Sequence, residues 1–133
     1  MINIFREIKW FIQRGRRGFS DMDKWNMHGY LSTVIPKMIR ELNIGSSGCP
    51  GDLYDATRIN DECWKWKEIC EEIAQGFEAA GYLDAYRYQK WVDSEKGDGL
   101  MTLEIDYVGI VNAKKKMERG LELFKEYYLG LWD

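Results

Sequence analysis

The sequence predicts an all-α fold, a compact bundle of four to five helices in a single domain over residues 1–133. Apolar residues recur at spacings of three and four along most of the chain, which is typical of amphipathic helices. Loop-forming residues gather in two segments, 44–58 and 93–103. A chain of 133 residues is long enough to bury a core without extra covalent links. The residues expected in this core include Trp25, Ile73, Phe77, Phe124 and Leu131.

The first helix is expected to begin after Asn3, whose side chain can cap it. Its apolar residues form a single stripe at helical spacing. These residues are Ile4, Phe5, Ile8, Phe11 and Ile12. Gly15 and Gly18 are expected to break the pattern, which would leave the arginines around them solvated or in contact with an anion. The helix is amphipathic and detachable, so it is also a candidate for self-association.

The second helix is expected to open at Ser20, because Asp23 three residues later completes a capping-box pattern. Its apolar stripe continues to Leu42, and Gly45 ends it. Pro36 lies inside the stripe, where a missing amide hydrogen and a steric clash disturb a helix. We therefore expect a kink or a short break at that residue.

The third helix is expected to be capped by Asn60 or Asp61. After a bend at Gly81, a helical stripe is expected to continue to about Val92, and a charged loop follows at 93–99. Glycines at the end of this helix should loosen it, since glycine is a poor helix former.

Leu103, Ile105 and Tyr107 alternate with acidic residues, which is a strand signal. Because an isolated strand has no partner, we interpret this segment as an extended lead-in to the last helix or as the start of that helix. The stripe of that helix comprises Ile110, Ala113, Met117, Leu121, Phe124, Tyr128 and Leu131. Gly120 beside it would permit close contact with another helix. Leu123 and Leu129 lie off the stripe and offer a surface for a homo-oligomer.

Charge and hydropathy exclude several classes of partner. The net charge is −3, with 19 basic and 22 acidic residues mixed along the chain, which argues against coating of bulk nucleic acid. No segment approaches the roughly 18 apolar residues of a membrane span, and no signal-peptide pattern is present. We therefore expect no membrane partner and a cytoplasmic location.

The cysteines and the single histidine do not suggest a metal site or a cofactor. Cys63 and Cys70 share a helical face but lie too far apart along the axis to bond. Together with Cys49 they are expected to be reduced thiols. Because no C-x-x-C motif occurs and His28 is the only histidine, a zinc site is not expected.

No catalytic residues are predicted, and the sequence does not favour an enzyme. A serine nucleophile needs its hydroxyl within hydrogen-bond reach of the base, and Ser20 is too distant from His28 along the helix. The many carboxylates lack the E-x-x-H pairs of di-metal bundles and are interpreted as solvated.

The best candidate binding site is the basic segment at residues 14–17. Guanidinium groups bind phosphate in a two-point geometry and stack on aromatic rings, and the following helix N-terminus favours anions. Two interpretations stay open: binding of a ligand or partner, or pairing of the arginines with Asp21 and Asp23. The candidate ligand-binding residues are Arg14, Arg16, Arg17, Trp10, Trp25 and Tyr30.

Two segments carry a family resemblance. Residues 17–31 (RGFSDMDKWNMHGYL) and 120–133 (GLELFKEYYLGLWD) resemble the opening and the close of a group of small tailed-bacteriophage proteins. Their patterns are R-G-x-x-D-x-D-x-W-x-x-D-x-Y-L and G-L-x-L-F-x-x-x-x-x-x-L-W-D. His28 stands where these relatives usually have Asp. The resemblance implies a phage gene acting in a host bacterial cell and no particular biochemical activity.

Small phage proteins that are neither capsid nor replication enzymes often counter host defence, and several bind nucleotide signals without cleaving them. The resemblance and the arginine cluster together favour sequestration of a phosphorylated nucleotide. The arginines would hold its phosphates, and Trp10, Trp25 or Tyr30 would stack on its base. The alternatives are a protein-binding inhibitor of a host defence complex, with an extended apolar surface, and a minor virion or assembly protein.

Overall fold

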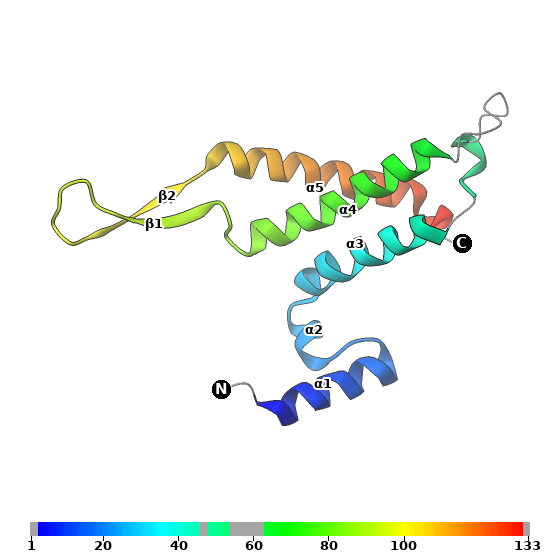
Figure 1. Ribbon diagram of the computed structural model, residues 1–133, viewed down its shortest axis with the longest axis horizontal. Coiled ribbons are helices and arrows are strands. Elements are labelled where there is room, and N and C mark those ends of the chain that lie inside the picture. The colour runs from blue at the N-terminus through cyan, green and yellow to red at the C-terminus, as the bar shows by residue number, and fades with distance from the viewer. Residues whose placement is uncertain (1–2, 46–47, 54–62, 132–133) are drawn as a thin grey trace.

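The computed structural model describes residues 3–45, 48–53 and 63–131. Within these ranges the chain forms five α-helices, two short 3-10 helices and one antiparallel two-stranded sheet (Figure 1). The elements are α1 (Ile4–Arg17), α2 (Asp21–Trp25), α3 (Met27–Gly45), η1 (Gly51–Leu53), α4 (Trp64–Asp84), β1 (Gln89–Asp93), β2 (Met101–Ile105), α5 (Tyr107–Tyr127) and η2 (Tyr128–Gly130). The prediction of an all-α bundle is confirmed, and a small hairpin is added to it.

The core lies where α4 packs between α3 and α5 (Figure 1). Two edge-to-face aromatic contacts join α4 to α5 in this core. The Trp66 and Tyr127 ring centroids are 5.7 Å apart, and those of Phe77 and Phe124 are 5.2 Å apart. The buried cluster consists of Ile39, Trp66, Cys70, Ile73, Phe77 and Leu123, with Phe124 and Leu131 packed against it. The expected burial of Ile73 and Phe77 is therefore correct, whereas Phe124 and Leu131, which were also expected to be buried, are only partly buried.

Trp25 is the exception among the expected core residues. It ends the short helix α2, and its side chain is 82% exposed. The prediction of a buried Trp25 is wrong, because α2 contacts the start of α3 and does not reach the core between α3, α4 and α5.

The second predicted helix is divided at Asn26 rather than at Pro36. Asn26 closes α2 with φ −123° and ψ 64°, and its side-chain oxygen accepts a 3.2 Å hydrogen bond from the Gly29 amide. Pro36 is buried inside α3, which runs unbroken through it. The capping box that opens this region, between Ser20 and Asp23, is present as predicted.

The glycines of α1 behave differently from one another. The helix continues through Gly15, so the predicted break there is wrong, and it ends at Gly18 with a left-handed φ of 82°. A glycine in a helix interior costs only about 1 kcal/mol relative to alanine, which the flanking helical turns can offset.

The segment after α4 contains the largest departure from the sequence prediction. Asn60 and Asp61 lie outside the described residues, and α4 begins after Cys63 and continues through Gly81. The helical stripe predicted as far as Val92 is wrong, since Gln89–Asp93 forms strand β1.

The alternating segment forms strand β2, and strand β1 supplies the partner that it lacked in the sequence prediction. The two strands are antiparallel, with Trp91 opposite Leu103, and the loop between them is closed by a 2.9 Å hydrogen bond from the Ser94 amide to the Leu100 carbonyl. The interpretation of this segment as an extended lead-in or a helix start is therefore wrong, because Met101–Ile105 is a paired strand. The hairpin extends beyond the ends of α4 and α5 in Figure 1.

On α5 the predicted stripe is buried at Ala113 and partly buried at Ile110, Met117 and Phe124, but it is exposed at Leu121 and Tyr128. Leu123 is 2% exposed, whereas Leu121 is 45% exposed. Leu123 is therefore a core residue and not part of an oligomer surface, while Leu129 remains 88% exposed. Gly120 approaches α4 closely, as the sequence predicted, because it meets Gly76 directly.

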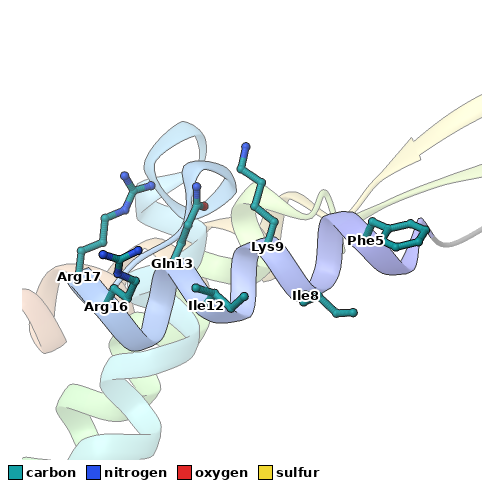
Figure 2. Close-up of a pocket in the computed structure, with 7 residues that line it drawn as sticks. All are labelled: Phe5, Ile8, Lys9, Ile12, Gln13, Arg16 and Arg17. Atoms are coloured by element: carbon teal, nitrogen blue, oxygen red, sulfur yellow. The ribbon is translucent and has the colours of Figure 1, made fainter.

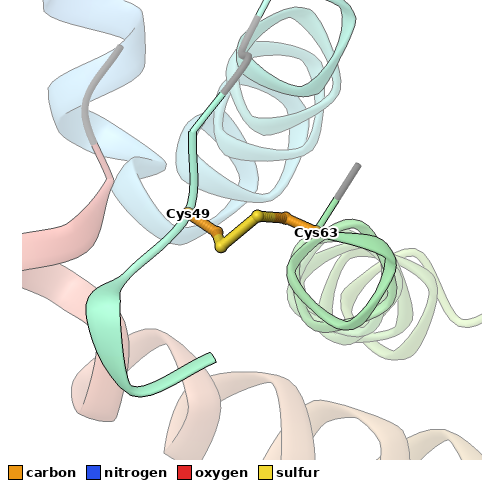
Figure 3. Close-up of a disulfide and its surroundings, with 2 residues drawn as sticks. All are labelled: Cys49 and Cys63. Atoms are coloured by element: carbon orange, nitrogen blue, oxygen red, sulfur yellow. A yellow bond between two sulfur atoms is a disulfide. The ribbon is translucent and has the colours of Figure 1, made fainter. Parts of the chain in front are cut away.

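Cys49 and Cys63 form a disulfide (Figure 3), which connects the segment after α3 to the start of α4. The expectation of three reduced thiols is wrong for these two residues. It is correct for Cys70, which is free and fully buried. A cysteine pair 14 residues apart carries no sequence signature of bonding, because only the packing of the chain brings the two sulfurs together.

Candidate functional site

The candidate site is the joint between α1 and α2. Gly18 ends α1 with a hydrogen bond from its amide to the Arg14 carbonyl, and Ser20 then caps α2. The Ser20 hydroxyl accepts a hydrogen bond from the Asp23 amide at 3.2 Å, and the Asp23 carboxylate accepts one from the Ser20 amide at 2.7 Å. These caps determine the angle at which α1 leaves α2.

Arg14 and Asp23 form a two-point ion pair across this joint. The Arg14 Nε donates to Asp23 Oδ2 at 2.8 Å, and Nη2 donates to Oδ1 at 2.6 Å. The Asp23 side chain is only 6% exposed, so the guanidinium is the main group that stabilises its charge. Hydrogen bonding from Arg14 accordingly holds the pKa of Asp23 well below its usual range.

Asp21 forms a second group of polar contacts between α1 and α2. Its carboxylate accepts hydrogen bonds from the side-chain amide of Gln13 at 2.7 Å and from Arg17 Nη2 at 2.5 Å. Lys9 Nζ lies 3.4 Å from Asp21 Oδ2. The hydrogen bond from Gln13, followed by that from Arg17, lowers the pKa of Asp21. Arg17 also stacks on Phe19, with its Cζ 4.7 Å from the ring centroid.

Of the two open interpretations, the structure shows pairing with aspartate for Arg14 and Arg17. Arg16 differs, because it forms no ion pair or hydrogen bond with any residue that the structure describes. It is an exposed cation at the end of α1.

Arg16 borders a shallow depression on the surface of α1 (Figure 2). All of its lining residues come from this one helix, so the depression is an open surface and not an enclosed pocket. Apolar and cationic groups both contribute to it. The lining residues are Phe5, Ile8, Lys9, Ile12, Gln13, Arg16 and Arg17.

The three aromatic candidates do not line this depression. Trp10 is half-buried, with the Arg6 guanidinium 4.8 Å above its ring. Tyr30 donates from its hydroxyl to the Gly18 carbonyl at 3.1 Å, which ties α3 to the joint. Trp25 is exposed. The six predicted binding residues therefore surround the joint without converging on one pocket.

Sequence reasoning missed the orientation of α1. The side that contacts α2 is polar and carries Gln13, Arg14 and Arg17. The apolar stripe is on the opposite side: Phe5 is 82% exposed, Phe11 77% and Ile4 65%, and no residue of α1 is buried. The only sequence signal for this arrangement is the pair of aspartates in α2. Asp21 and Asp23 form ion pairs with basic residues of α1 and so hold the basic side of the helix against α2.

The β1–β2 hairpin is the second exposed apolar surface. Register partners share a face, so Trp91, Met101 and Leu103 lie together on one side, and they are 65%, 53% and 37% exposed. Gln89, Asp93 and Ile105 lie on the same side, with Asp93 opposite Met101. The other face carries Val92 beside the polar residues Lys90, Thr102 and Glu104, with Lys90 Nζ 3.1 Å from Glu104 Oε2. Sequence reasoning did not find this surface, because it placed residues 89–92 in a helix.

Several other charged groups link helices to one another. His28 Nε2 lies 2.7 Å from Asp84 Oδ1, which links the start of α3 to the end of α4. Arg40 donates to both Glu71 and Glu78 between the same two helices. Across the described residues, no three His, Cys, Asp or Glu side chains cluster as metal ligands would. None of the described helices combines the length and apolarity needed to cross a membrane.

Comparison of the chain with protein-family models, curated proteins and solved structures finds no match.

Proposed function

We propose that the chain is a non-enzymatic binding protein whose partner is another protein, and that this partner docks on the apolar face of the β1–β2 hairpin. The observation that carries the proposal is the exposure of Trp91, Met101 and Leu103 on one side of a hairpin that extends away from the helices (Figure 1). Large exposed apolar groups gathered on one face are typical of interaction surfaces.

The backbone of the hairpin supports the same proposal. In a two-stranded sheet each strand is an edge strand, so the outer amide and carbonyl groups of β1 and β2 are free of ladder partners within the sheet. An isolated hairpin is only marginally stable and gains from a third strand. An extended segment of the partner would add to one edge by backbone hydrogen bonds, and Trp91 would provide the anchor for specificity.

The family resemblance suggests where the partner belongs. In a phage-encoded protein, this surface would bind a component of a host defence complex and inhibit it. A partner from the phage particle would instead make the protein a minor virion or assembly component.

The test is site-specific photo-crosslinking in bacterial cells that express the protein. A photoreactive residue replaces Trp91 in one variant and Thr102 in the control. The two positions are on opposite faces of the same hairpin. We expect one discrete crosslinked protein with the probe at position 91 and none with the probe at 102. Equal crosslinking from both faces, or none from position 91, would contradict the proposal.

Sequestration of a phosphorylated nucleotide is the second candidate function, and the cations of the α1 depression favour it. Arg16 has no described partner, and Lys9 and Arg17 lie on the same surface (Figure 2). Guanidinium groups suit phosphate, and Trp25 offers an exposed ring for stacking on a base.

This second function is tested by incubating the purified protein with a panel of cyclic and ADP-ribose-derived nucleotides and analysing the ligand released on heating. Recovery of an intact nucleotide, with binding lost in Arg16→Ala, would support sequestration. Arg16→Ala is the informative variant because it leaves the pairs of Arg14 and Arg17 with aspartate intact. Release of a chemically altered nucleotide would indicate an enzyme. The absence of nucleotide binding would count against sequestration and leave protein binding at the hairpin as the proposed function.

A further inference from the structure

We propose that α1 is a membrane-surface helix that inserts its apolar stripe into the interface of a bilayer with anionic headgroups. The inference is independent of the partner assigned to the hairpin. It rests on the orientation of α1, on its charge and on the size of its apolar surface.

The orientation of α1 is the reverse of that of a helix packed on a core. At 3.6 residues per turn, Ile4, Ile8 and Phe11 fall within a stripe that spans roughly 120° of the helix. The residues that bond to α2 lie on the other side of the helix. The stripe therefore points away from the protein with its side chains at least half exposed. The exposed stripe residues are Ile4, Phe5, Ile8, Phe11 and Ile12.

The charge of α1 complements an anionic surface. The helix holds five basic residues and one acidic residue, Glu7, although the whole chain has a net charge of −3. Lys9, Arg14 and Arg17 pair with aspartates of α2, whereas Arg16 has no ion-pair partner among the described residues. Lys9 and Arg16 line the same depression as Phe5, Ile8 and Ile12, so cations border the apolar stripe (Figure 2). An apolar face with a basic border is the arrangement of helices that lie in the plane of a membrane interface.

A second copy of the chain fits this face less well. A stable specific interface uses about 20–30 residues from each partner, whereas the stripe provides a handful from one helix. Two stripes packed together would also bring the cations that border each of them close to one another, which is unfavourable. Anionic lipid satisfies the apolar stripe and its cationic border at the same time.

This mode of binding differs from a membrane span. A helix of 14 residues is about 21 Å long, too short to cross a hydrocarbon core of about 30 Å. The sequence-based expectation of no membrane partner was general, and it was based on the lack of a spanning segment and of a signal peptide. The arrangement of α1 revises that expectation for peripheral binding.

The experiment is co-sedimentation of the full chain with vesicles, either of phosphatidylcholine alone or of equal parts phosphatidylcholine and phosphatidylglycerol. We expect binding to the anionic vesicles, weaker binding at high salt, and little binding to the neutral ones. The Phe5→Glu/Phe11→Glu variant should lose at least about tenfold in binding, since charged groups oppose insertion. Arg16→Gln should lose roughly fivefold, the contribution of one cation near an anionic surface.

The matched control is Val108→Glu/Leu129→Glu, which adds the same charge at two equally exposed apolar positions outside α1. It should bind anionic vesicles like the unmodified chain. Circular dichroism of each variant checks that the fold is intact, and every substituted side chain is exposed. Equal binding by the α1 variant and its control, or no binding by the unmodified chain, would overturn the proposal.

Two further measurements separate lipid from the other occupants. Inorganic phosphate or ADP-ribose, added at matched ionic strength, should not release the protein from vesicles, and release would assign the cations to free phosphate instead. Sedimentation without lipid should give the same mass for the unmodified chain and for Phe5→Glu/Phe11→Glu. A dimer lost in that variant, without vesicle binding, would assign the stripe to a second copy.

Discussion

Gly76 and Gly120 face each other where α4 crosses α5, with no room for a side chain between them. A Cβ on Gly76 would lie 2.6 Å from the Cα of Gly120, and a Cβ on Gly120 would lie 2.6 Å from the Cα of Gly76. This contact sets the distance between the two helices whose ends carry the hairpin. It therefore positions the proposed protein-binding surface relative to the bundle.

Gly120→Ala should destabilise the protein by about 1–3 kcal/mol, because the added methyl group meets backbone atoms that cannot move aside easily. The control is Gly15→Ala, at which an added Cβ meets nothing within 4 Å. That change should stabilise the helix by about 0.5–1 kcal/mol. Urea unfolding of both variants measures the difference, and a loss of stability in Gly15→Ala would contradict it.

Leu123→Ala and Leu121→Ala form a second matched pair on α5. Leu123 is 2% exposed within the core, and its truncation should cost about 2–5 kcal/mol through lost burial and the resulting cavity. Leu121 is 45% exposed, so its truncation should cost less than about 1 kcal/mol. Similar unfolding midpoints for the two variants would show that the face of α5 is assigned incorrectly.

Reduction of the Cys49–Cys63 disulfide should destabilise the protein by about 3 kcal/mol, the magnitude expected for a loop of this length. Urea unfolding with and without a reducing agent measures the effect. The Cys49→Ser/Cys63→Ser variant should already be destabilised and should not respond to the agent. An unchanged midpoint of the native chain on reduction would argue that the bond adds no stability.

Cys70 should stay unreacted when the folded protein is treated with iodoacetamide. Burial excludes the reagent and raises the pKa of the Cys70 thiol to about 11, so the reactive thiolate is scarce at neutral pH. Mass spectrometry should detect alkylation of Cys70 only after unfolding in urea. Labelling under native conditions at the rate of a free thiol would show that the core opens around this residue.

Acid should weaken the joint between α1 and α2. The pKa values of Asp21 and Asp23 lie below their usual value of about 4 in the folded chain, because Gln13, Arg14 and Arg17 bond to the ionised carboxylates. Their contribution to stability is therefore present above pH 4 and is lost as the pH falls below it. The free energy of unfolding should decrease less between pH 5 and pH 3 in Asp21→Asn/Asp23→Asn than in the native chain.

Contacts close in sequence account for what was predicted correctly. The Asn3 cap of α1, the capping box of Ser20 and Asp23, and the buried side of α4 at Ile73 follow from residues three or four apart. The close approach of Gly120 was also predicted from its position beside the apolar stripe of its own helix. Local hydrogen bonds and helical periodicity are sufficient to specify such features.

Contacts between residues distant in sequence determine the features that were predicted wrongly. Strand β1 has its partner across a loop, Cys49 meets Cys63 only in the folded chain, and Trp25 is exposed because α2 stops short of the core. The sequence by itself determined that α1 is an amphipathic helix with a basic side. The tertiary structure decided which side faces outward, because the ion pairs with Asp21 and Asp23 bring the polar side to the protein and leave the apolar stripe exposed.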